Sequence, residues 1–455
     1  PDARRRAREE VTARHEILRT RYREQNGEPV QVVDEPGPVR LTVLDLSRDR
    51  DAERRVDDLV AAESRRPFAL EREWPVRTWL LRVAEDEHVA VTVLHHIAFD
   101  GWSMRILLHE LHALYAAFAE GRPSPLLPVA VQYADFAAWQ RGHLAASTAE
   151  LDHWRERLDG LTPLELPADR PRAAVRDESG AVLRCTIPAP LAERLRTLAR
   201  SHRASLFMVA LAVFQIQVGR YTGRRDVAVG TPVAGRTRPE FADLIGYAVN
   251  TLVLRTRWAG DPAFAELLAS VRTTVLDAQA HQDVPFEHLV RELAPERDAS
   301  RPPLFQLSFG MHDGPESADL PGVRTSREDV DSGVAKFELG VQLAERPDGS
   351  VGVELEYATA LFDPETVERF AAHYLHLLAS AADDPDAPLS RLAMLTEQDR
   401  TELVSTPATL PEADRCLHEA FQEQAARHPG KTAVTYRGEQ WTYGRLDSRA
   451  EEIAR

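Results

Sequence analysis

A strand that passes directly into a helix, with two histidines at the junction, is the sequence feature that most constrains this chain's fold. Over residues 88–96 the side chains alternate between two faces, which is the period-two pattern of a half-buried strand. We therefore predict that His95 and His96 end a strand and that Asp100 and Gly101 lie in the turn before a helix. The helix is indicated by apolar residues that recur at helical spacing from about Trp102, at Met104, Leu107, Leu108, Leu111, Tyr115 and Phe118. A polar cluster beside a flexible glycine on such a rigid scaffold indicates a functional site.

The composition indicates a soluble globular protein of two or three domains. The chain has 455 residues, of which 43% are apolar and 28% charged. A net charge of −16 argues against nucleic-acid binding, because phosphate contacts need a basic surface. Cys185 and Cys416 lie far apart and support neither a disulfide framework nor a zinc site. With no apolar run as long as a membrane span and no signal peptide, we expect a cytoplasmic location.

Breaks in the pattern divide the chain into segments. A stretch rich in Pro and Arg at 164–180 separates two α/β units, and the second unit includes a predicted strand at 245–256. Pro and Asp concentrate at 383–395, which is typical of a linker. The last ~40 residues follow the pattern of a helix, two short strands and a helix, too few residues for an independent core. The first helix, to about Arg19, has no capping residues before it, which suggests that the chain starts inside a domain.

The histidine pair is open to three interpretations. Adjacent strand residues point to opposite faces, so His95 and His96 cannot easily share one metal ion, and no third ligand follows at a recognisable spacing. A structurally satisfied histidine is the ordinary reading of a lone His. Asp100 and Gly101 weaken that reading, because a buried Asp needs a cation or several N–H donors. The third interpretation is acyl transfer, in which a neutral His holds or accepts a proton from an attacking amine.

The segment LHHIAFDGWS (94–103) resembles the HHxxxDGWS signature of condensation domains from nonribosomal peptide synthetases. In the form of RHE at 14–16 and HQDVPFE at 281–287, the chain is most similar to the subtype that joins two L-configured residues. The family's first motif has no counterpart here, and Tyr247 and Ala248 replace larger apolar residues, which bears on the local shape of the expected tunnel. Further segments resemble family motifs in the family's order: RHEILRT (14–20), YADFAAW (133–139), IGYAVNTLVLR (245–255), HQDVPFEHL (281–289) and RDASRPPLFQLSF (297–309).

The resemblance implies an α/β fold of two chloramphenicol-acetyltransferase-like lobes that form a V with a tunnel between them, plus a short C-terminal fragment. It assigns residues 1–165 to the N-terminal lobe, lacking its first segment, and residues 166–382 to the C-terminal lobe. Residues 383–412 are then a linker. Residues 413–455 are the beginning of an adenylation domain, since WTYGRL (441–446) is similar to the opening motif of such domains.

By the same resemblance, the reaction is peptide-bond formation in natural product biosynthesis. An acyl or peptidyl group moves from the phosphopantetheine thioester of an upstream carrier protein to the α-amine of an aminoacyl thioester on a downstream carrier protein. The chain itself is expected to bind no cofactor, because the carriers present the substrates on 4′-phosphopantetheine. The implied partners are the donor and acceptor carriers and the adjacent adenylation domain, without nucleic acid or membrane.

The resemblance also assigns roles within the central motif. His96, the second histidine, is expected to face the tunnel and to orient or deprotonate the attacking amine; the sequence leaves open which of the two it does. Gly101 is expected to let substrate approach the backbone closely, and its N–H is expected to face the developing oxyanion. His95 belongs to the same motif.

The remaining assignments are structural or line the tunnel. Asp100 is expected to form a buried ion pair with Arg301 that fixes the loop and the pose of the catalytic histidine. Trp102, Ser103 and Asn250 are the candidates for the tunnel wall, although Trp102 also fits a core anchor and Asn250 a hydrogen bond at a strand end. No metal ligand is expected.

Two other functions stay open. One is another acyltransferase with a His-x3-Asp motif (His96 to Asp100) that takes acyl groups from CoA thioesters. The adenylation-like tail argues against it, because such enzymes stand alone. The other is a non-catalytic module that docks carriers or partner proteins. Non-catalytic members of the family lose the second His or the Gly of the motif, whereas this chain keeps His96 and Gly101.

Overall fold

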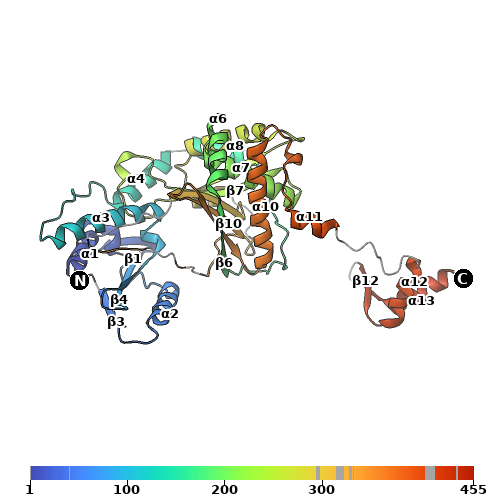
Figure 1. Ribbon diagram of the computed structural model, residues 1–455, viewed down its shortest axis with the longest axis horizontal. Helices are drawn as coiled ribbons and strands as arrows, with labels where there is room; N and C mark the ends of the chain where they lie inside the picture. Colours follow the sequence, from blue (N-terminus) through green and yellow to red (C-terminus); the bar gives the residue numbers. More distant parts are fainter. Residues whose placement is uncertain are drawn as a thin grey trace. The chain divides into compact units, whose positions relative to one another are not determined.

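The computed structural model describes residues 2–39, 41–146, 148–293, 298–313, 322–326, 330, 333–404, 416–436 and 439–454. These residues form two compact units, Pro1–Met394 and Leu395–Arg455, and each is described by itself. The larger unit contains both α/β regions that the sequence predicts, and Figure 1 follows its chain from α1 to α10.

The first α/β region combines a two-stranded and a three-stranded sheet. In the three-stranded sheet, β4 lies parallel to β3 and antiparallel to β5. The sequence missed β1, which pairs with β2 through a tight turn at Asn26 and Gly27, both at positive φ, as a type I′ hairpin requires. The elements are α1 (Asp2–Arg14), β1 (Thr20–Gln25), β2 (Glu28–Val33), β3 (Leu41–Asp45), α2 (Ala52–Arg65), β4 (Val76–Arg82), β5 (His88–Leu94), α3 (Gly101–Ala119), α4 (Tyr133–Ala146) and α5 (Thr148–Leu158).

Helix α1 packs along α3 through a cluster of buried apolar side chains, among them Val11, Ile106 and Leu114. A buried polar contact fixes the same pair of helices, because Nε2 of His15 lies 2.8 Å from Oε2 of Glu110 and Arg14 donates to the same carboxylate. The helix that carries the central motif is therefore anchored on a packed neighbour.

The second α/β region is built on a six-stranded sheet in the order β6-β11-β10-β9-β7-β8. Its strands β10 and β9 are parallel, as are β7 and β9, and the other neighbours are antiparallel. Helix α7 is buried along most of its length and contacts α6, α8 and α10 (Figure 1). The elements are β6 (Gly180–Ile187), α6 (Ala189–Ser201), α7 (Leu206–Thr222), β7 (Asp226–Val233), β8 (Asn250–Arg257), α8 (Phe264–Ala280), α9 (Phe286–Leu293), β9 (Leu307–Asp313), β10 (Leu339–Glu345), β11 (Val351–Ala358) and α10 (Pro364–Asp383).

The apolar core of the second region extends beyond the predicted boundaries at both ends. Trp154 and Leu158 of α5 are buried in the same cluster as the six-stranded sheet, so the chain joins this core before residue 165. At the other end, Leu389 and Leu392 are buried in that cluster, and Pro388 bridges to Ala263. The prediction that the linker starts at 383 is wrong, because residues 384–394 keep apolar side chains that pack on the core despite their Pro and Asp content. Residues 405–412 of the predicted linker lie outside the described residues.

The smaller unit follows the predicted order of a helix, two strands and a helix, after one additional helix. Strands β12 and β13 pair antiparallel, and Phe421 packs against Tyr443. Its elements are α11 (Glu397–Val404), α12 (Leu417–Arg427), β12 (Thr432–Tyr436), β13 (Glu439–Thr442) and α13 (Tyr443–Ala454).

No single helix among the described residues is long and apolar enough to cross a membrane. Helices α6 and α7 pass that test of length and composition only when they are counted together, across a bend of 101°.

Candidate functional site

The predicted strand-to-helix junction is present, but the two histidines lie outside the strand. Strand β5 ends at Leu94, and residues His96–Ala98 form a turn of 3-10 helix before α3 begins at Gly101. The prediction of a helix from about Trp102 is confirmed. The prediction that His95 and His96 end the strand on opposite faces is wrong, because His95 is the extended residue that follows the strand and the chain coils from His96 onward.

The His96 ring is held in one orientation by two contacts. Its Nδ1 lies 2.8 Å from the carbonyl oxygen of Phe99. A carbonyl can only accept a hydrogen bond, so Nδ1 of the neutral ring carries the proton and Nε2 keeps its lone pair. The Tyr247 ring meets the imidazole edge-on, with centroids 5.4 Å apart. The His96 side chain is exposed, so its free nitrogen is accessible from outside the protein core.

His95 has the opposite arrangement and a structural role. Its Nδ1 accepts a hydrogen bond from the backbone N–H of Ile97, so the neutral ring carries its proton on Nε2. The ring packs against Phe68 in a T-shaped contact. Burial, reinforced by the neighbouring His96, lowers the pKa of His95 and keeps the ring neutral as an acceptor. The structure thus gives His95 the part of a cap for the turn that presents His96.

Asp100 is the most heavily bonded side chain of the junction, and its exposed side-chain fraction is only 1%. It is the N-cap of α3, and Oδ1 accepts from the N–H and the hydroxyl of Ser103. Arg236 donates to both carboxylate oxygens, at 2.9 and 3.0 Å. The backbone N–H groups of Ala248 and Val249 donate to Oδ2 at 3.0 and 3.1 Å. One carboxylate therefore joins the motif of the first α/β region to two loops of the second.

The predicted partner of Asp100 was wrong. Arg301 lies instead against Glu165, 2.9 Å away, and Asp298, 2.7 Å away. The cation that neutralises Asp100 is Arg236, whose side chain is 2% exposed. Because the carboxylate is buried, it needs a cation with two donors in a rigid fork, and Arg236 at the end of the loop after β7 supplies it.

Sequence reasoning missed Arg236 although the segment DVAVGTPVAGR (226–236) ends on it. The one available signal was the glycine before it. Gly235 has φ +65, and a Cβ there would lie 1.8 Å from the carbonyl oxygen of Ala248. Only glycine allows the two loops to approach this closely, so Gly235 marks the crossing that delivers Arg236 to Asp100.

The charge balance at Asp100 favours the ionised carboxylate. Burial is the largest single influence and by itself raises the pKa of an Asp. The hydrogen bonds and charge of Arg236, together with the hydrogen bonds from Ser103, outweigh it and lower the pKa of Asp100 below its ordinary value of 3.8. The carboxylate is thus committed to charge pairing and cannot act as a proton carrier near neutral pH.

The predicted tunnel residues have different environments. Trp102 is 36% exposed and donates from Nε1 to the carbonyl oxygen of Ala242. Ser103 is fully buried and cannot line a tunnel, so that prediction is wrong. Both N–H bonds of the Asn250 amide are used, by the carbonyl oxygens of Gln282 and Val284. Asn250 is therefore a brace at the strand end, the alternative that the sequence also allowed.

Gly101 has space above it. A Cβ at this position would meet no atom within 4 Å, and its φ is not positive. The backbone conformation does not require glycine here, so the missing side chain leaves room beside the first turn of α3. Gly101 follows directly on Asp100 and is exposed.

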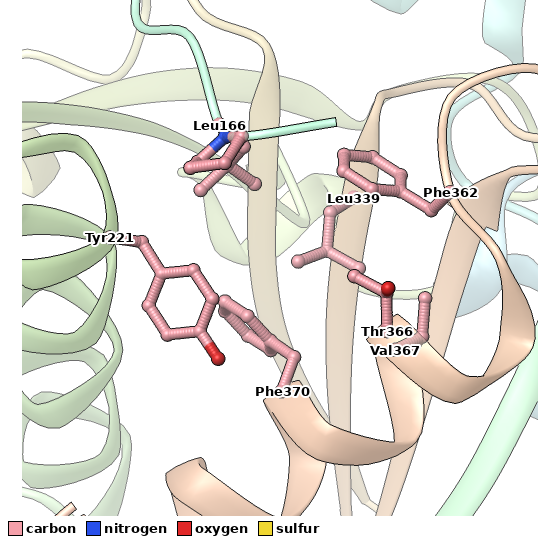
Figure 2. Close-up of a pocket in the computed structure, with 8 residues that line it drawn as sticks. Leu166, Tyr221, Leu339, Phe362, Thr366, Val367 and Phe370 are labelled. Atoms are coloured by element: carbon pink, nitrogen blue, oxygen red, sulfur yellow. The ribbon is translucent and has the colours of Figure 1, made fainter. Parts of the chain in front are cut away.

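Two cavities elsewhere do not include the motif. One, of about 20 Å³, lies in the core of the second region among Tyr221 of α7, Leu339 of β10 and Phe370 of α10 (Figure 2). Its volume is about that of a single water molecule, so it is a packing void rather than a substrate site. The other, of about 660 Å³, is an open polar hollow beside α1, next to Arg6 and Phe118. Neither is lined by His96 or Gly101.

Comparison with known proteins connects this geometry to one family. A family model described as "Condensation domain" matches residues 1–404. The chain is 40% identical to a linear gramicidin synthase of Brevibacillus parabrevis over 455 residues, which are 98% of this chain and 9% of that protein. It is also 40% identical to phosphinothricin tripeptide synthetase PhsC of Streptomyces viridochromogenes, over 98% of this chain and 42% of that protein. The chain thus spans less than half the length of these relatives.

Solved structures also resemble this chain. The X-domain from teicoplanin biosynthesis is 30% identical with a TM-score of 0.78, over 87% of this chain and 90% of that one. The same X-domain in complex with OxyB gives the same TM-score and identity, over 87% and 88%. The first condensation domain of the calcium-dependent antibiotic synthetase, in complex with a substrate analogue, has a TM-score of 0.72 over 87% and 91%. At 24% identity, that last likeness concerns the fold alone.

We predict that Arg236→Ala destabilises the chain far more than Arg301→Ala. Loss of Arg236 leaves the Asp100 carboxylate buried without a cation, which costs about 3–5 kcal/mol of unfolding free energy. Arg301→Ala breaks ion pairs to two exposed carboxylates and removes a cation near the buried Glu338, which keeps its ion pair with Arg172, so it costs a small fraction of that. Urea unfolding of both variants followed by circular dichroism measures the difference. Equal losses would show that Asp100 does not depend on Arg236.

We also predict that the ion pair makes stability depend on acidity. Because the pKa of Asp100 is lower in the folded state than its ordinary 3.8, the stabilisation is complete above that value and is lost as the pH falls through the lowered pKa. The matched reference is Asp100→Asn/Arg236→Gln, which removes both charges. The chain should lose stability relative to this variant only below about pH 4. Parallel stability curves down to about pH 2.5 would contradict the assignment.

Proposed function

Because this chain belongs to the condensation-domain family, we propose that it forms a peptide bond between substrates held on two carrier proteins. The acyl or peptidyl group leaves the phosphopantetheine thioester of an upstream carrier and joins the α-amine of an aminoacyl thioester on a downstream carrier. The thiol is the leaving group, and the amine loses one proton. The observation that carries the proposal is the exposed His96 ring, whose Nε2 lone pair is set free by the Nδ1 bond to Phe99.

His96 interacts with the proton that the attacking amine loses. The attacking amine must be neutral and its lone pair must point at the thioester carbon, and Nε2 can accept the amine N–H that points away from that carbon. Deprotonation and simple positioning both need this same lone pair. The Phe99 carbonyl and the edge of Tyr247 hold the ring without using Nε2, so the group is preorganised before substrate arrives.

Gly101 and the start of α3 stabilise the negative charge that develops on the thioester oxygen. The first N–H groups of a helix have no acceptor within the helix, and the aligned peptide dipoles make this end positive. The tetrahedral intermediate carries its negative charge on the former carbonyl oxygen, which an N–H at this helix start stabilises. The empty volume beside Gly101 allows the thioester to come close to that backbone.

Holding the two substrates in position supplies much of the remaining rate enhancement. Two tethered substrates that meet end to end lose little further translational freedom when they react. We propose that the first and the second α/β region act as two lobes around such a tunnel. We also propose that the segment from 413 begins an adenylation domain and that the joined residues are both L-configured. The partners are then the donor carrier, the acceptor carrier and the adenylation domain. The chain itself holds no cofactor in this scheme, and the synthetase is cytoplasmic.

A docking function is the second candidate, and the likeness to the X-domain solved in complex with OxyB favours it. On that alternative the chain would recruit a partner protein without bond formation. The presence of both His96 and Gly101, in the geometry described above, supports catalysis over docking. An acyltransferase that uses CoA thioesters has no comparable observation in its favour.

We predict that His96→Ala lowers the rate of peptide formation by about 10²–10⁴-fold, the usual contribution of a positioned proton acceptor. The assay mixes the full chain with two purified carrier domains, each loaded with an L-amino acid from a panel, and follows both carriers by intact-protein mass spectrometry. The transfer adds the donor residue's mass to the acceptor carrier. Because the His96 side chain is exposed, the melting temperature should not change.

The matched control is His88→Ala, an exposed histidine at the start of the same strand. It should retain full activity. An unchanged rate in His96→Ala would remove His96 from the mechanism. Absence of product with the unaltered chain over the whole panel, together with tight binding of a carrier, would favour docking.

We predict that Gly101→Ala folds normally but loses activity. The added Cβ meets no protein atom, and alanine is the better helix former, so stability should be equal or slightly higher. The methyl group would occupy the space through which the thioester reaches the backbone. Gly142→Ala in α4 is the control, because its Cβ also meets no atom within 4 Å. Full activity in Gly101→Ala would exclude a close approach of substrate at this backbone.

A further inference from the structure

We propose that His153, Asp277 and His281 form a binding site for a divalent transition-metal ion such as Zn²⁺, which would join helix α5 to helix α8. One ligand atom from each of the three side chains lies within 4.8 Å of the other two. Imidazole nitrogen with carboxylate oxygen is a ligand set that Zn²⁺ and related ions take in proteins. The proposal concerns a place distinct from the central motif and does not depend on the reaction proposed above.

Two of the three ligand atoms already have a suitable separation. Nε2 of His153 lies 3.3 Å from Oδ2 of Asp277. An ion in tetrahedral geometry at about 2.0–2.2 Å from each ligand places its ligands roughly 3.3–3.5 Å apart. An ion can therefore enter between these two atoms without separating the helices.

His281 is prepared as a third ligand. It lies four residues after Asp277, so both side chains project from the same face at the end of α8. Its Nδ1 lies 2.9 Å from the backbone oxygen of Asp277 and must donate to it, which leaves Nε2 as the nitrogen with a lone pair. A histidine ligand that donates its other N–H to a backbone carbonyl is the usual arrangement around protein metal sites.

The His153 ring supplies an independent observation. Its Nε2 has almost no solvent-exposed surface and makes no well-aligned hydrogen bond within the described part of the chain, although Oδ2 of Asp277 lies 3.3 Å away. A buried polar atom that lacks a well-aligned hydrogen bond costs free energy, and a structure rarely retains one without a reason. The His281 ring is stacked on this ring, with centroids 3.6 Å apart and planes 2° from parallel. Metal binding would tilt His281 out of the stack toward Nε2 of His153.

The competitor for the site is Arg157. Its Nε lies 3.3 Å from the same Oδ2 of Asp277, and its side chain is 42% exposed. An exposed ion pair of this kind holds its carboxylate weakly. The metal must displace Arg157 from one oxygen. Removal of this guanidinium should therefore strengthen metal binding.

The test is Zn²⁺ binding to the full chain, prepared without an affinity tag and stripped of metal. Calorimetric titration with ZnCl₂ in a non-chelating buffer measures affinity, and thermal melting with and without Zn²⁺ measures stabilisation. We expect one site per chain. His153→Ala should weaken it more than about tenfold, at least the loss that follows removal of an outer-shell partner. Arg157→Gln should tighten binding several-fold, because it removes the competing charge.

His376→Ala is the control, since His376 is an exposed histidine on α10, and it should bind Zn²⁺ as the unaltered chain does. His281→Gln replaces His153→Ala if the latter does not fold. Equal Zn²⁺ affinity in the unaltered chain, His153→Ala and His281→Gln would assign the ion to adventitious surface groups and overturn the proposal. Weaker binding in Arg157→Gln would overturn it as well.

Discussion

The buried ion pair between Asp100 and Arg236 is the interaction on which the rest of the site depends. Two charges that are nearly inaccessible to water persist only when their remaining bonding capacity is filled. Here Ser103 and the backbone N–H groups of Ala248 and Val249 fill it. The donors to Asp100 come from separate parts of the chain. A shift of any one segment would leave a buried charge incompletely bonded, so the α3 start and the two loops of the second region are held in a single arrangement.

The position of His96 follows from this constraint. Asp100 caps α3, which fixes where the helix begins, and the coil of residues His96–Ala98 has to close the short distance between that helix and β5. Phe99 presents its carbonyl to Nδ1 from the end of this coil, and Tyr247 stands immediately before the Ala248 N–H that bonds Asp100. The same interaction thus locates both groups that orient the imidazole. His96 takes no part in the buried ion pair, and its Nδ1 bond to Phe99 leaves Nε2 free.

Local patterns in the sequence predicted local structure well and distant pairings poorly. The strand before the histidines and the helix from Trp102 could both be predicted, because each depends on periodicity within a short window. The family resemblance assigned Arg301 to Asp100, and sequence reasoning missed Arg236, because nothing in either segment shows which loop crosses to Asp100. The crossing depends on Gly235 and on the packing of whole sheets. The predicted start of the linker at residue 383 was wrong for a related reason. Leu389 and Leu392 pack against elements that come much earlier in the chain. The cluster of His153, Asp277 and His281 lay beyond sequence reasoning because its ligands come from two helices more than a hundred residues apart.

The distinction between catalysis and docking rests on a small part of this structure. Asp100 and Arg236 stabilise the arrangement of the segments whether or not a bond is formed, so a purely recruiting relative would retain the same fold and the same ion pair. The free lone pair of His96 and the empty space beside Gly101, in contrast to the ion pair, do not hold the segments together. Neither stabilises the folded chain: an exposed imidazole nitrogen contributes little, and a glycine in a helix at ordinary φ is less favourable than alanine. A chain that only docked partners would gain stability from a change at Gly101 and lose none from a change at His96. The presence of both residues in this arrangement is therefore the observation on which the proposal of a reaction at this point of the molecule rests.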